Sequence, residues 1–150
     1  MRRVLTTVAD ARAAVGQELG PSGPLVVTQD RITAFAEATD DEQWIHVDPE
    51  RAAAGPYGST VAHGYLTLSL LPSFGRQLFD VAFASSRLNY GVNKVRFPSP
   101  VPVGSALRAR ATVLDVVEGA AGVMLTVKYV VEADDAPKPV CVAEVLVLAP

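Results

Sequence analysis

Residues 63–79 read HGYLTLSLLPSFGRQLF, and this stretch decides the fold. Its apolar residues fall on nearly every side of a helix, which predicts a helix buried over most of its surface. They are Leu66, Leu68, Leu70, Leu71, Phe74 and Leu78. Pro72 lies within the stretch and predicts a kink or a break, because proline lacks the N–H that a helix interior requires. We therefore expect a buried, interrupted helix at the centre of the molecule.

The hydrophobic pattern changes after Asp80, from the helical period to an alternation of apolar and polar residues. Such alternation predicts strands with one buried face. The expected strands cover residues 87–97, 105–117, 123–132 and 140–148, with a hairpin turn at 119–122 and a connection at 134–139. A buried helix followed by long antiparallel strands predicts an α+β fold in which the sheet wraps round the helix. One such sheet exposes an edge and an apolar face, so we expect pairing with a second copy.

The first third of the chain is expected to be mainly helical. The pattern predicts, in order, a helix over residues 8–15, a turn over 20–24, a strand over 25–27 and a helix from 29 to about 39. Gly16 would end the first helix, and Thr28 is a good N-cap for the second. Residues 40–48 are polar and are expected to be irregular, after which Pro49 can open a helical turn.

Length and composition indicate one globular domain over residues 1–150. Hydrophobic residues make up 49% of the chain and charged residues 19%, a balance that excludes a disordered protein. The net charge of −3 comes without a basic stripe, so nucleic acid is not an expected partner.

The cysteine content and the apolar stretches indicate the compartment. Cys141 is the only cysteine, which excludes an internal disulfide and fits a reducing cytosol. Its place in an alternating apolar run predicts a buried structural thiol. No secretory h-region follows the first arginines, and no apolar stretch is long enough to span a bilayer. We expect a cytoplasmic protein without a membrane partner.

The segment that holds Asp41 and His46 is the first candidate for chemistry. A carboxylate and an imidazole in one irregular segment can hold a water molecule between them for general acid–base work. An acidic loop is more often simply solvated, so spacing alone leaves both interpretations open. His63 and Gly64, which begin the buried helix, are the second candidate. Free N–H groups at a helix start can stabilise an oxyanion, although the same residues can merely turn the chain.

Other site chemistries fit the sequence poorly. Two histidines and a nearby aspartate could bind a metal, but no HxxxH or HxH spacing supports a metal site. No GxSxG, P-loop or GxGxxG motif is present. Ser69 and Ser73 are expected to be polar helix positions rather than nucleophiles.

Three segments resemble, in order along the chain, the motifs of MaoC-like proteins. Residues 35–48, FAEATDDEQWIHVD, resemble the hydratase motif, in which an aspartate precedes a histidine by five residues. Residues 62–64, AHG, resemble the His-Gly that opens the family's central helix. Residues 88–101, LNYGVNKVRFPSPV, resemble the family's central strand and the turn after it. The resemblance begins at about residue 24 and is strongest to the short, NodN-like members.

This resemblance implies a hot dog fold, in which a long helix is wrapped by an antiparallel sheet that continues across a homodimer. It implies (R)-specific hydration of trans-2-enoyl-CoA to (R)-3-hydroxyacyl-CoA without a metal or organic cofactor. Asp41 and His46 would hold the catalytic water, and the Gly64 N–H would polarise the thioester carbonyl. Substrate-binding or supporting roles would fall to Gln43, His63, Asn89, Tyr90 and Asn93.

The sequence departs from the family pattern at two positions, and several functions remain open. Asp40 stands where many members have glycine, and Pro72 stands where some have serine. We expect Asp40 to face solvent. The same residues would serve a dehydratase that acts on 3-hydroxyacyl groups bound to a carrier protein, so an acyl-CoA and an acyl-carrier-protein thioester are both expected substrates. A thioesterase and a non-catalytic acyl-binding subunit are further alternatives.

Overall fold

The computed structural model describes all 150 residues and contains one large antiparallel sheet. Its long strands lie in the order β6, β7, β8 and β5, which cover Ala106–Gly119, Gly122–Ala133, Cys141–Ala149 and Leu88–Arg96. Two short strands, β2 (Glu18–Leu19) and β3 (Leu25–Val26), pair with β6. All four predicted long strands are confirmed, and so is the hairpin turn, which joins Gly119 to Gly122.

The expected buried helix is present as two helices, α5 (Gly64–Ser69) and α6 (Leu71–Leu78). The break lies at Leu70, so Pro72 falls in the first turn of α6, where its missing N–H costs no hydrogen bond. The predicted interruption is therefore confirmed. The prediction of apolar contacts nearly all round is wrong in part, because Pro72 and Arg76 are exposed on the outer face of α6.

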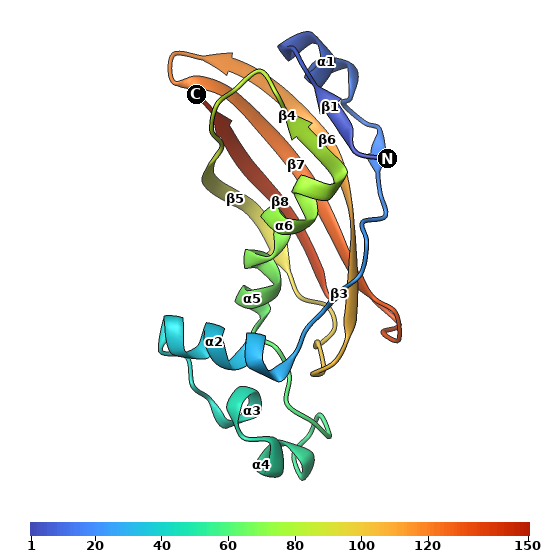
Figure 1. The fold of residues 1–150 in the computed structure, drawn as a ribbon, viewed down its shortest axis with the longest axis vertical. Helices are drawn as coiled ribbons and strands as arrows, with labels where there is room; N and C mark the ends of the chain where they lie inside the picture. Colours follow the sequence, from blue (N-terminus) through green and yellow to red (C-terminus); the bar gives the residue numbers. More distant parts are fainter.

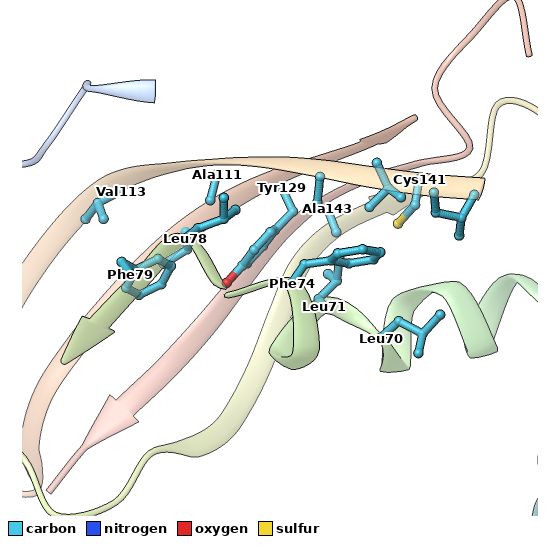
Figure 2. Packing of buried hydrophobic residues seen from close by; sticks show 14 of the residues in the cluster. Leu70, Leu71, Phe74, Leu78, Phe79, Ala111, Val113, Tyr129, Cys141 and Ala143 are labelled. Atoms are coloured by element: carbon cyan, nitrogen blue, oxygen red, sulfur yellow. The ribbon is translucent and has the colours of Figure 1, made fainter. Parts of the chain in front are cut away.

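The sheet curves round α6, and this contact forms the core (Figure 1). Phe74 and Leu78 of α6 point towards Tyr129 of β7 and Ala143 of β8 (Figure 2). Gly75 permits this approach, since a Cβ at that position would lie 2.5 Å from the Tyr129 hydroxyl oxygen. The alternation of buried and half-buried residues along β6 and β7 is the pattern that the sequence predicted for one buried face.

The first third of the chain forms the expected short helices, α1 (Val8–Ala13), α2 (Gln29–Thr39) and α4 (Pro49–Ala53). The Thr28 side chain accepts a hydrogen bond from the Arg31 N–H at 3.2 Å, which confirms the predicted N-cap. The expectation of a wholly irregular segment at 40–48 is wrong, because Trp44–Val47 form α3. Helices α2, α3 and α4 gather at the end of the molecule where α5 begins (Figure 1).

The structure adds an element that the sequence did not predict. Strand β1 (Arg3–Leu5) pairs in parallel with β4 (Phe79–Val81), directly after α6. The pairing brings Arg2 to within 3.0 Å of Asp80, a contact between residues far apart in the sequence. The α+β architecture is otherwise as expected. No helix combines the length and the apolar character needed to cross a membrane.

Strand β5 is an edge of the sheet and carries exposed apolar side chains. Leu88, Tyr90 and Val92 are 55%, 61% and 51% exposed, and their strand pairs only with β8. An uncovered apolar edge favours association, because its N–H and C=O groups can pair with another strand. The strand that the motif resemblance led us to expect at the centre of a dimeric sheet is thus an edge strand in one protomer.

We expect the protein to be a homodimer that pairs through β5. Light scattering at micromolar concentration should give twice the chain mass, and Val92→Lys should shift the protein towards monomer because it places a charge in the interface. Val117→Lys is the matched control, since Val117 is 53% exposed but lies on β6. A wild-type monomer, or equal effects of the two lysines, would contradict pairing through β5.

Candidate active site

Asp41 follows a sharp turn at the end of α2. Asp40 has a left-handed backbone conformation, with φ of 57°, and ends the helix as its C-cap. As expected, Asp40 is exposed, whereas Asp41 is half-buried. The turn therefore separates two adjacent carboxylates and directs only the second one towards the interior.

His46 lies on α3 and is buried, with one ring nitrogen fixed. Its Nδ1 lies 2.6 Å from the Val61 carbonyl oxygen. A carbonyl oxygen only accepts hydrogen bonds, so Nδ1 carries the proton in the neutral ring and Nε2 keeps a free lone pair. The ring can thus accept or return a proton at Nε2 without losing its anchor.

Two residues that the sequence analysis did not single out hold the backbone of α3. The Gln29 side-chain amide donates to the His46 carbonyl oxygen at 2.9 Å. The Thr60 hydroxyl donates in turn to the Gln29 side-chain carbonyl at 2.6 Å. These residues are 31 positions apart in the chain, so no local sequence signal links them.

His63 and Gly64 stand at the start of α5, as predicted. His63 is the N-cap residue and is only 3% exposed. Gly64 is the first helical residue, so its N–H has no partner within the helix. A Cβ on Gly64 would lie 2.8 Å from the Phe97 ring, which means that this position is closed to larger residues unless the ring moves.

The His63 ring contacts both members of the Asp41–His46 pair. Its Nε2 lies 2.9 Å from the Asp41 main-chain carbonyl oxygen, and its ring stacks on His46 with centroids 3.7 Å apart. Its Nδ1 is buried and has no hydrogen-bond partner. A buried polar atom without a partner costs about 1–3 kcal/mol. Most buried polar atoms in proteins are therefore paired, and this exception needs an explanation.

The three side chains converge closely enough to raise the question of a metal ion. One ligand atom each from Asp41, His46 and His63 lie within 4.8 Å of one another. The two stacked imidazole planes differ by only 22°, however, so their lone pairs lie in two nearly parallel planes with ring centroids 3.7 Å apart. Two histidine ligands on one metal need lone pairs that meet at the ion. The arrangement fits a bound water better than a chelated metal.

The other predicted site residues lie outside this cluster. Gln43 is exposed at the N-cap of α3 and makes no capping hydrogen bond with its side chain. Asn89, Tyr90 and Asn93 are all exposed on β5 and form no hydrogen bond with Asp41 or His46. Asn89 lines the larger of the two clefts described below. The roles expected for these four residues stay predictions.

Two clefts flank α5. The smaller one, about 240 Å³, lies beside Gly64 and includes Thr67, Phe97 and Val101. The larger one, about 650 Å³, lies between α5, α6 and strands β5 and β8. Its apolar walls include Leu68, Leu71 and Val145. The larger cleft therefore has room for an elongated apolar group, on the same side of the sheet as α5 and α6.

Cys141 does not belong to the cluster. It is fully buried in the core, and burial raises the pKa of its thiol to about 11. A thiol with that pKa is uncharged near neutral pH and is a poor nucleophile. The prediction of a structural thiol is confirmed.

Comparison with known proteins places the chain in a family. Residues 10–134 match the model of the MaoC like domain. The chain is 50% identical over 146 residues to 3-hydroxyacyl-thioester dehydratase Z of Mycobacterium tuberculosis, and the matched region covers 97% of both proteins. It is 41% identical over 140 residues to nodulation protein N of Rhizobium leguminosarum, which covers 91% of this chain and 87% of that protein.

Solved structures show the same architecture. An Archaeoglobus protein described as a monoamine oxidase regulatory protein superimposes with a TM-score of 0.77 at 25% identity, covering 99% of this chain and 97% of that one. The (R)-hydratase from A. caviae gives a TM-score of 0.73 at 23% identity, covering 91% and 96%. The predicted hot dog fold is thereby confirmed. On the family match and the close relatives together, the chain belongs to the MaoC-like dehydratase family and is a hydro-lyase.

Proposed function

We propose that the protein interconverts (R)-3-hydroxyacyl thioesters and trans-2-enoyl thioesters by removing and adding water. The observation that carries this proposal is the convergence of the Asp41 carboxylate and the anchored His46 ring near the start of α5. The 50% identity to a protein named 3-hydroxyacyl-thioester dehydratase supports the choice of substrate class.

The sequence motifs favour hydration of enoyl-CoA, with dehydration of a carrier-bound 3-hydroxyacyl group as the alternative. The name of that relative supports the dehydration reading better than the hydration reading. The two directions share one transition state, so the same residues serve both. The cell's supply of the two thioesters then decides which direction runs.

The proposed chemistry requires two changes in the substrate. A proton is removed from or added to C2, and a hydroxyl group leaves or joins C3. In dehydration, the Asp41–His46 pair takes a proton from C2 and returns one to the departing hydroxyl, so that water leaves. In hydration, the pair orients and deprotonates water and delivers a proton to C2. Coupled groups titrate as a pair, so we assign the acid and base roles to the pair and not to single residues. General acid–base help of this kind contributes about 10²–10⁴-fold.

The second part of the proposal concerns the thioester carbonyl. Negative charge collects on its oxygen as the enolate-like transition state forms. The Gly64 N–H, unpaired at the start of α5, can donate to that oxygen. One well-placed donor of this kind contributes about 10²–10³-fold. The cleft of about 650 Å³ alongside α5 and α6 has room for the acyl chain, which could lie against Leu68, Leu71 and Val145.

The direct test is turnover by the purified protein. A short trans-2-enoyl-CoA should lose its conjugated absorbance, and the product should be oxidised by an (R)-specific but not an (S)-specific 3-hydroxyacyl dehydrogenase. The same thioesters loaded on an acyl carrier protein form the parallel arm, which separates the two substrate sources. EDTA should leave the rate unchanged, because the stacked imidazoles are poorly arranged for metal binding.

Three outcomes would count against the proposal. Loss of activity on chelation with recovery on added zinc would replace the acid–base pair by a metal centre. Release of free thiol without loss of water would indicate a thioesterase. Absence of turnover in both directions and on both carriers would leave an acyl-binding subunit as the better description.

A further inference from the structure

We infer that His63 is a positioning residue for the Asp41–His46 pair and holds both members through different parts of its ring. This inference deepens the proposed function and rests on it. The first contact is with Asp41, whose main-chain carbonyl oxygen lies 2.9 Å from His63 Nε2. Because a carbonyl can only accept, Nε2 carries the proton and donates it.

The bond from His63 decides where the Asp41 carboxylate points. Asp41 directly follows the left-handed turn at Asp40, and its carboxylate makes no hydrogen bond or ion pair with another residue. The bond from His63 to its main-chain carbonyl is therefore the hydrogen bond that restrains the position of Asp41. The His63 bond fixes that backbone at the first position after the turn, where the chain would otherwise be free to rotate.

The second contact is with the His46 ring. The His63 ring stacks on it at 3.7 Å, and Phe35 packs against His63 at 4.9 Å. His46 is tethered at Nδ1 by the Val61 carbonyl, and a ring held at one edge can still swing about that bond. The stacked face of His63 limits that swing and so keeps His46 Nε2 directed at the site.

A purely structural explanation of His63 fits the observations less well. A larger aromatic ring could stack on His46 and pack on Phe35 without burying an unpaired nitrogen. The imidazole instead leaves Nδ1 buried without a partner, while Nε2 bonds to Asp41. The hydrogen bond from Nε2 to Asp41 thus explains why a histidine occupies this position. His63 also directly precedes Gly64 in the chain. It therefore connects the proposed oxyanion donor, the Gly64 N–H, to the Asp41–His46 pair.

The test compares two amides that differ by one methylene. His63→Gln can place its amide N–H where Nε2 lies, and His63→Asn can place it only where Nδ1 lies. We expect kcat to fall less than about tenfold for the glutamine variant and about 10²-fold for the asparagine variant, since misplacement by ~1 Å costs that much. KM should stay within about threefold for both, because His63 does not hold the substrate.

A third variant guards against loss of folding. His63→Phe keeps an aromatic ring to stack on His46 and removes the bond to Asp41. Its ring is larger than imidazole, so kcat is measured well below the melting temperature of the variant and should fall about as far as in the asparagine variant. Equal kcat for the glutamine and asparagine variants, a wild-type kcat for the phenylalanine variant, or a rise in KM alone would overturn the inference.

One measurement is independent of activity. The chain has only two histidines, so their ring ¹⁵N signals can be assigned by comparing single variants. Without substrate, His63 should show a protonated, slowly exchanging Nε2 and a bare Nδ1. The opposite tautomer would overturn the positioning role even in an active enzyme. The expected tautomer in a protein that turns over no thioester would instead refute the proposed function and leave the geometry intact.

Discussion

Asp41→Asn is expected to lower kcat by about 10³-fold, within the range that general acid–base groups contribute. The asparagine keeps the size and most of the hydrogen-bonding capacity of the side chain but cannot take or return a proton. The fold should be unaffected, since Asp41 is half-buried and its carboxylate has no partner in the structure. Steady-state kinetics with a short enoyl-CoA, together with a thermal unfolding curve, measure both effects.

Asp40→Gly provides the matched control for this prediction. Asp40 is the neighbouring carboxylate, but it is exposed and has φ of 57°, a conformation that glycine adopts at no steric cost. We expect a wild-type kcat and an unchanged or slightly raised stability, because exposed positions usually alter stability by less than about 0.5 kcal/mol. Loss of turnover in Asp40→Gly with retention in Asp41→Asn would mean that the register of the proposed site is wrong by one residue.

His46→Asn is expected to have an effect of similar size, about 10²–10⁴-fold on kcat. The asparagine amide can still donate to the Val61 carbonyl in place of Nδ1, so the anchor of α3 is retained. What is lost is Nε2, the atom that carries the lone pair towards the site. A comparable fall in His46→Ala with a lower melting temperature would separate the chemical contribution of the ring from its packing.

The double variant tests whether the two residues act as one unit. If Asp41 and His46 share a single water or a single proton path, removing the second should cost little beyond the worse single variant, as in other sites whose residues act together. Independent sites would instead give a product of the two losses, about 10⁶-fold. That product, or wild-type rates in both single variants, would show that the pair is not the centre of the reaction.

The elements of the fold were predictable because their signals are local. The alternation in β6 and β7 and the leucines of α5 and α6 reflect which faces are buried, and burial leaves a period in the sequence. Pro72 predicted the interruption of the central helix for a similar reason, since its effect extends only over one turn. The helix α3 was missed because its four residues are too few to show a period.

The presence of Asp41 and His46 in one segment was likewise predictable, because His46 lies only five positions after Asp41. The part played by Gln29 and Thr60 was not readable. Their hydrogen bonds join segments that are 17 and 31 residues apart, and nothing local in either segment indicates the other. The pairing of β1 with β4 was missed for the same reason.

The sequence by itself determined the central helix, the antiparallel strands that follow it and the two motifs that carry the candidate chemistry. Each of these depends on residues that are neighbours in the chain. Only the tertiary structure decided that His63 lies against Asp41 and His46, because that contact joins Asp41 and His63, which are 22 positions apart in the chain. It also decided the tautomers of both rings, since the carbonyls that accept their protons belong to distant residues. Proton positions are set by such partners, and partners across the fold leave no period in the sequence.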